Sequence, residues 1–290
     1  DRSRATLGLA SALIDDGQPA EAEQTLREFI GLRGAAWHIR MALASLQQGK
    51  LPQTKTEVAL VKPEDVGAAD RSWHLYLQGQ VFESAGDLNR AKELYQQAES
   101  SALSGLARAR FVLAREQARL RLGPVTEAEA EVQRRNLDQF QGRKISYGIA
   151  RTYAAMLDSL GHKERAVSLL QQQLATMPVE ERDELDTTRL VLGLIGGAAD
   201  GAGRNALGEL VRDGNDRDLQ RVALQLLAKA STRDPARSDF RRRLDTLIAQ
   251  PSAHPILEDL LLFRAVLLLA DKSYALAEDD ARALLQKFPG

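Results

Sequence analysis

The sequence contains no cysteine. Disulfides, catalysis by a thiol and zinc sites with cysteine ligands are therefore excluded. Aromatic residues make up only 5% of the 290 residues, alanine and leucine dominate, and no segment has the pattern of a β-strand. This composition is typical of helices that pack closely on one another rather than of sheets. The sequence predicts an all-α protein.

Charge of one sign is also lacking, since the formal net charge is −1. Without a basic or acidic field we expect neither nucleic acid nor an anionic membrane surface as a partner. No run of 18 apolar residues occurs, because Glu258, Asp259 and Arg264 interrupt the longest candidate at 256–270. That segment is predicted to be a buried helix, without membrane insertion.

The ends of the chain suggest a part of a longer protein. The sequence begins with Asp1 rather than methionine, shows no signal peptide, and ends at Gly290 where a helical repeat would close. We expect a fragment of a longer protein, either cytoplasmic or from a bacterial periplasm or envelope. The amino-acid composition, rich in Ala, Leu, Arg and Gln, favours a bacterial origin. The oligomeric state stays open.

Residues 72–105 contain the clearest internal pattern. Two amphipathic helices are predicted there, hinged at Gly86-Asp87, because small and aromatic residues recur at i, i+4 and i+7. These positions are Leu75, Gly79 and Phe82 in the first helix, and Ala91, Tyr95 and Ala98 in the second. The short hinge makes the two helices antiparallel, with the small residues at their crossing and with Phe82 and Tyr95 filling the space beside it.

This spacing of small, aromatic and turn residues resembles a tetratricopeptide repeat (TPR), which has a period of about 34 residues. Aligning the chain on its turn glycines gives eight such repeats, of which the sixth and seventh are the loosest. They lie near 3–34, 35–68, 72–105, 109–146, 147–180, 184–214, 216–250 and 258–290. The resemblance implies one solenoid over 1–290, a right-handed α-α superhelix of about eight antiparallel pairs, with first helices lining its concave surface.

Two loops invite a ligand interpretation that their sequences do not support. The glycine-rich segment 196–205 lacks the Gly-Lys-Ser/Thr ending of a phosphate loop and follows a helix, so a flexible turn is predicted. In the segment 213–218, Arg217 stands where a calcium loop needs an acceptor, and Leu224 stands where it needs a bidentate Glu, so a linker with a helix N-cap is predicted. We therefore predict no metal, no cofactor and no catalytic residue.

Histidines and a short basic run complete the set of candidate chemical groups. The four histidines are far apart in sequence and have no ligand spacing, so exposed or half-buried imidazoles are expected. Arg241, Arg242 and Arg243 point in different directions on a helix, and Asp239 and Asp245 can offset them. A solvated face is the favoured interpretation, and a phosphate site is the alternative.

The third repeat offers a candidate partner site. Leu75 takes the inward position that an aromatic usually holds in the family, so Trp73 is expected to project from the concave face with Tyr76 and Gln80. Tryptophan and tyrosine often anchor interfaces. The alternative, that Trp73 packs against the preceding repeat, stays open. In the same register, the groove would continue through Arg110, Gln117, Arg121 and Arg151.

These residues point to an extended, partly acidic peptide as the partner. The leading hypothesis is a non-catalytic scaffold that binds a protein or extended peptide in its concave groove. The alternative is the helical interaction region of a larger enzyme or envelope-assembly protein, whose active domain lies outside this chain. The Lys and Asn pair with which some TPR proteins hold a terminal carboxylate is not found.

Overall fold

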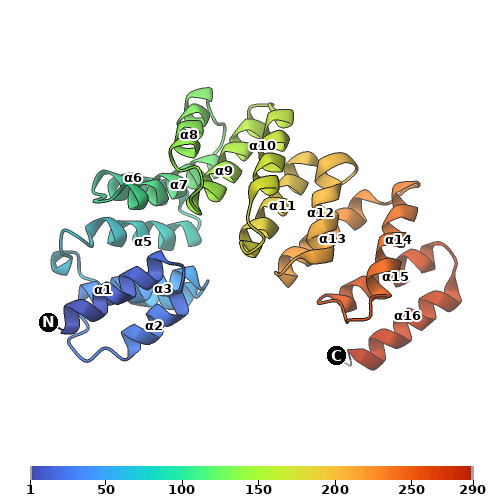
Figure 1. The fold of residues 1–290 in the computed structure, drawn as a ribbon, viewed down its shortest axis with the longest axis horizontal. Helices are drawn as coiled ribbons and strands as arrows, with labels where there is room; N and C mark the ends of the chain where they lie inside the picture. Colours follow the sequence, from blue (N-terminus) through green and yellow to red (C-terminus); the bar gives the residue numbers. More distant parts are fainter. Residues whose placement is uncertain (1, 289–290) are drawn as a thin grey trace. The chain divides into compact units, whose positions relative to one another are not determined.

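The computed structural model describes residues 2–288, which form sixteen α-helices, one short 3-10 helix and no strand. The predicted all-α solenoid of paired antiparallel helices is confirmed (Figure 1). Pro289 and Gly290, at the end of the predicted eighth repeat, lie outside the described residues. None of the described helices combines the length and hydropathy needed to cross a bilayer.

The helices group into two compact units, one up to Thr126 and one from Glu127 onward. The amino-terminal unit contains α1 (Arg2–Asp15), α2 (Pro19–Arg27), α3 (Ala35–Gln47), α4 (Leu51–Ala59), η1 (Pro63–Asp65), α5 (Arg71–Ser84), α6 (Leu88–Ser100) and α7 (Gly105–Arg121). The carboxy-terminal unit contains α8 (Glu127–Gln139), α9 (Ile145–Ser159), α10 (Lys163–Thr176), α11 (Arg182–Gly196), α12 (Gly201–Asp213), α13 (Arg217–Ala230), α14 (Ala236–Ile248), α15 (Leu257–Ala270) and α16 (Tyr274–Lys287).

The turns between paired helices rest on residues in the left-handed backbone region. Gly17, Gly49, Gly86 and Gly161 follow first helices with φ between 70° and 86°, a conformation that glycine adopts without steric cost. In the last pair, Lys272 takes this place with φ 59°. These are the turns from which the repeats were aligned in the sequence, and each reverses the chain.

The third helix pair shows why small residues stand at the crossings. A Cβ atom built on Gly79 would lie 2.7 Å from Cδ1 of Tyr95, so the glycine allows the tyrosine ring to lie against the α5 backbone. The expectation that Phe82 fills the space beside this crossing is wrong, because its side chain is 39% exposed. Leu77 is fully buried, and it packs in the core that α5 shares with the preceding helices.

Two helix starts have a local cause, and the second of them differs from the sequence prediction. α7 begins at Gly105 because the Ser104 hydroxyl accepts a hydrogen bond from the Ala107 amide (3.1 Å) and caps the helix. α12 begins at Gly201, inside the predicted flexible loop. A Cβ atom on Gly203 would lie 2.8 Å from the Gly197 amide nitrogen, so this glycine allows α12 to start close against the end of α11.

We predict that Ala154→Leu lowers the free energy of unfolding by about 1–3 kcal/mol. Ala154 is fully buried in α9, and the added methylenes would force neighbouring core side chains out of their rotamers. Chemical denaturation followed by circular dichroism measures this. An unchanged unfolding midpoint would contradict the buried position of Ala154.

Candidate binding surface on the first helices

A cleft of about 150 Å³ opens between the first helices α1, α3 and α5 of the amino-terminal unit. Because all three are first helices of their pairs, the cleft lies on the surface where the sequence placed the partner site. Its wall includes Trp73 and several residues that the sequence did not single out. The lining residues are Ser11, Ile14, Asp15, Ile39, Arg40, Leu43, Ala69, Asp70 and Trp73.

Trp73 is half-buried and serves both packing and the cleft. Its ring meets Phe111 edge-on at a centroid distance of 5.0 Å, and the Arg110 guanidinium lies 5.8 Å from the ring centroid. Trp73 packs against the core of the preceding repeats, as the alternative interpretation expects, and against the following helix α7, and it also borders the cleft. Its role in binding a partner stays a prediction.

Tyr76 and Gln80 turn toward neighbouring helices rather than into open solvent. The Tyr76 ring packs between those of Tyr95 (5.8 Å) and Phe111 (5.3 Å), and burial raises the pKa of Tyr76 to about 12. Gln80 Nε2 donates to the Tyr95 hydroxyl at 2.8 Å. Neither side chain lines the cleft.

The Tyr95 hydroxyl connects this cluster to a surface ion pair. It donates to Glu83 Oε2 at 2.5 Å, and Glu83 in turn pairs with Arg121 at 2.7 Å. Burial, followed by the hydrogen bond to Glu83, raises the pKa of Tyr95 above its ordinary value. The tyrosine therefore stays neutral and keeps donating its proton, which holds α5, α6 and α7 in register.

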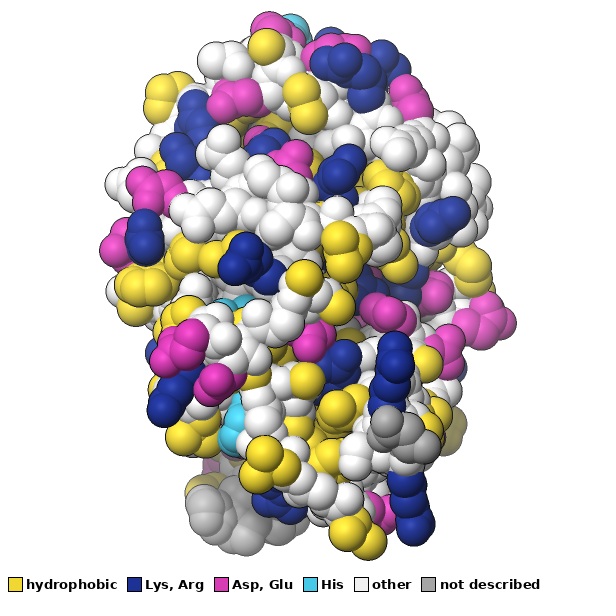
Figure 2. Space-filling view, turned by 90° about the vertical axis from the view of Figure 1, so that its left-hand side faces the viewer, with side chains coloured by type: hydrophobic (Ala, Val, Ile, Leu, Met, Phe, Trp, Pro, Cys, Tyr) yellow, Lys and Arg dark blue, Asp and Glu magenta, His cyan; other side chains and the backbone are white. Residues whose placement is uncertain are grey.

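Two ion pairs involve residues of the cleft. Arg40 pairs with Asp70 at 3.2 Å and donates from Nε to the Ser11 hydroxyl at 2.8 Å, and Arg110, which does not line the cleft, pairs with Asp15 at 3.1 Å. Both signs of charge are therefore present in the cleft wall. Figure 2 shows the same mixture of signs on the face that it displays.

The arginines expected to bind a ligand carboxylate are already paired within the chain. Arg110 meets Asp15, and Arg121 meets Glu83. In the carboxy-terminal unit, Arg151 meets Glu184 at 2.6 Å and also donates to the Thr188 hydroxyl. Gln117 lies on α7 and also interacts within the chain. A ligand carboxylate would have to compete with these acids.

Sequence reasoning missed Arg40, Asp15 and Asp70, which supply most of the charge in the cleft. All three lie on or beside the first helices of repeats one to three, so the repeat alignment already placed them near Trp73. A charged residue on a largely apolar first helix could have indicated this surface in the sequence. Arg40 is such a residue within α3.

Histidine and acidic residues gather at no metal site within residues 2–288. His38 pairs with Glu57 at 2.7 Å, and His162 pairs with Glu127 at 2.8 Å. The expectation of exposed or half-buried imidazoles is wrong for His74 and His254, which are buried and whose pKa values are lowered by burial. Burial favours the neutral ring, which packs as a core side chain.

The segment 213–218 forms the predicted helix cap. The Asp216 carboxylate accepts hydrogen bonds from the Asp218 and Leu219 amides at 2.8 and 3.1 Å, which starts α13. The buried carboxylate of Asp186 on α11 accepts from the Asn215 amide at 2.6 Å. Of the acidic residues in this segment, Asp216 caps the helix, whereas Asp213 pairs with Arg212 and Asp218 pairs with Arg221.

Comparison with known proteins identifies a shared fold. No protein-family model matches the sequence, and no curated protein matches it. Among solved structures, the chain is similar to a Rap protein, in its crystal structure complexed with competence and sporulation factor. The TM-score is 0.60 with 14% sequence identity, over 98% of this chain and 97% of that one. This likeness supports the helical solenoid.

Proposed function

We propose that this protein is a non-catalytic interaction scaffold that binds an extended peptide segment of a partner in the cleft between α1, α3 and α5. The observation that carries the proposal is the cleft itself, where the half-exposed Trp73 stands beside Arg40 and Asp70. A rigid aromatic wall with polar groups that fix direction is a common arrangement for a binding hot spot.

The peptide is expected to carry an apolar side chain and a carboxylate. The apolar side chain would fill the space beside Trp73, Ile39 and Leu43. The carboxylate would replace Asp15 on Arg110, because the Asp15 side chain is 56% exposed and such surface pairs contribute at most about 1 kcal/mol. Arginine can form two parallel hydrogen bonds to one carboxylate, which would set the direction of the peptide.

The likeness to the Rap protein supports this proposal as a precedent. A helical chain of the same fold has been crystallised with a bound factor. At 14% identity the likeness concerns the fold, so the cleft residues of this chain need their own test.

Peptides selected from a displayed random library on the full chain provide that test. We expect Trp73→Ala to weaken the tightest peptides about 30-fold, which corresponds to about 2 kcal/mol. Trp37→Phe is the matched control, because Trp37 is buried away from the cleft, where its indole donates to the Leu26 carbonyl. Its affinity for the same peptides should stay within about twofold.

Because Trp73 also packs on Phe111, Trp73→Ala is expected to lower stability, and folding of each variant is checked by circular dichroism. The Trp37→Phe chain keeps Trp73 as its single tryptophan, so its fluorescence reports on the cleft even where Trp73→Ala does not fold. The proposal is wrong if the selected peptides leave Trp73 fluorescence unchanged, or bind a folded Trp73→Ala chain as tightly as the original.

A further inference from the structure

One arginine of α14 has no acidic partner within residues 2–288. The others are paired: Arg237 and Arg241 with Asp271, and Arg242 with Asp239. Asp245, which the sequence offered as a counter-charge for the basic run, pairs with Arg264 of α15 instead. Arg243 is exposed, as expected for a solvated face, but neither of the two expected acids offsets its charge.

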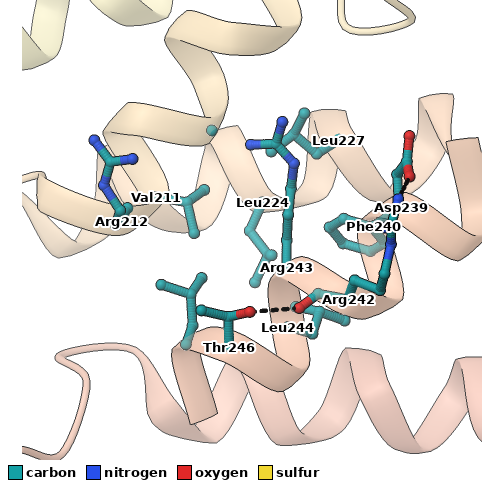
Figure 3. Close-up of a pocket in the computed structure, with 12 residues that line it drawn as sticks. Val211, Arg212, Leu224, Leu227, Asp239, Phe240, Arg242, Arg243, Leu244 and Thr246 are labelled. Atoms are coloured by element: carbon teal, nitrogen blue, oxygen red, sulfur yellow. Dashed lines mark hydrogen bonds and ion pairs between the residues drawn. The ribbon is translucent and has the colours of Figure 1, made fainter. Parts of the chain in front are cut away.

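Arg243 is directed across the gap toward α12, as Figure 3 shows. There its guanidinium lies against Gly208, where a Cβ atom would overlap Nη1. The missing side chain leaves room for the cation. Nearby Arg204 is only 7% exposed and donates to Ala198 O and Ser231 Oγ, without a carboxylate partner. Among the described residues no acid forms an ion pair with Arg204 or Arg243. Burial lowers the pKa of Arg204, and the charge of Arg243 helps to lower it further.

Arg243 borders a groove of about 620 Å³ between α12, α13 and α14, entirely within the carboxy-terminal unit. This volume is within the range of ligand sites. The floor is apolar, and the rim carries Arg212, Arg242 and Arg243 with Asp239 (Figure 3). The floor residues are Val211, Leu224, Leu227, Phe240, Leu244 and Leu247.

We propose that this groove is a second binding site, which takes an acidic segment of a partner protein. A carboxylate of the segment binds Arg243, and an adjacent apolar side chain lies over Leu224 and Phe240. Charge complementarity carries the assignment, because a carboxylate supplies the counter-charge that Arg243 lacks, and the guanidinium fork matches a carboxylate. The site shares no residue with the first-helix cleft and does not depend on it.

The apolar floor favours a peptide over a phosphate-bearing ligand. A free phosphate or a nucleic-acid backbone would use the arginines and leave the floor without a partner. The chain as a whole also has a net charge of −1, which gives no long-range attraction for nucleic acid. An acidic peptide with neighbouring apolar side chains satisfies both parts of the groove.

Parallel selection of displayed peptides on the original chain and on Arg243→Ala tests the proposal. Some clones should bind the original chain but not the variant. We expect these clones to carry Asp or Glu beside Leu, Ile or Phe. As end-blocked synthetic peptides, they should bind Arg243→Ala at least about tenfold more weakly in fluorescence polarisation. Arg243→Lys should fall between, because lysine keeps the charge without the fork. Arg243 is exposed, so these variants should fold.

Two control variants assign the binding to this groove. Arg282→Ala removes an exposed arginine that is paired with Glu278 on α16, and Trp37→Phe alters a buried residue of the other unit, so both should change the affinity less than twofold. The proposal is overturned if no clone distinguishes Arg243→Ala, or if a folded control variant loses the same binding. It is also overturned if the clones that distinguish the two chains contain no Asp or Glu. A phosphate site is shown instead if no acidic peptide binds, and if inorganic phosphate raises the melting temperature of the original chain but not that of Arg243→Ala.

Discussion

Replacing Gly203 with alanine is expected to lower the free energy of unfolding by about 3 kcal/mol. The new methyl group would lie within 3 Å of the Gly197 amide nitrogen and the Gly196 carbonyl carbon, which are backbone atoms that cannot rotate away. The close start of α12 against α11 would then have to open. Denaturant unfolding followed by circular dichroism at 222 nm measures the change.

Gly208→Ala, in the same helix, is the matched control. Its methyl group would meet only the flexible end of the Arg243 side chain, which can move aside. In a helix interior, alanine is more stable than glycine by up to about 1 kcal/mol. Stability should therefore stay the same or rise slightly. If both variants lost the same free energy of unfolding, the close approach of the helices at Gly203 would not be the cause of the loss.

Replacing Glu23 with glutamine is expected to lower the free energy of unfolding by about 2–3 kcal/mol at neutral pH. The Glu23 carboxylate is buried and receives Lys50 Nζ at 2.6 Å, Gln48 Nε2 at 2.8 Å and Arg27 at 2.5 Å, which connects α2 to the next helix pair. The hydrogen bond from Lys50 is the largest of the effects that lower the pKa of Glu23 to about 2. Glutamine keeps one acceptor oxygen, but it loses the charge and places an NH2 group where the other oxygen accepted hydrogen bonds, so part of this donor set is left unpaired.

The pH dependence of this loss has a definite direction. Because the folded-state pKa of about 2 lies below the ordinary value of 4.5, ionised Glu23 stabilises the fold above pH 4.5. That contribution declines as pH falls from 4.5 to 2. The difference between Glu23→Gln and the original chain should therefore shrink over this window. A difference independent of pH would contradict the assignment, and Glu278→Gln, an exposed pair on α16, should show little effect at any pH.

The helix pairs could be predicted from the sequence because the relevant signals are local. Gly86 and Gly161 mark turns, and the apolar period between such turns fixes which face of each helix is buried. The glycines near 203 were misjudged because glycine serves two purposes, a left-handed turn or a close helix approach. Gly203 serves the second, and only the position of α11 reveals it.

The composition of the binding surface was harder to predict because ion pairs form between residues that are distant in sequence. Arg110 meets Asp15, which lies 95 residues away, and Arg151 meets Glu184, 33 residues away. A repeat register places a side chain on a face but does not name its partner on the next helix. For the same reason the sequence did not single out Arg243. Arg241 and Arg242 form ion pairs with acids, whereas Arg243 forms none with a described residue.

Amide hydrogen exchange of the full chain, with and without a selected peptide, tests the proposed function most directly. If the peptide binds in the cleft, the added protection should fall on residues 11–15 of α1, 39–43 of α3 and 69–76 at the start of α5. The Trp73→Ala chain should lose this protection at the same peptide concentration. Protection confined to the second helices α2, α4 and α6, with none on α1, α3 or α5, would contradict the account.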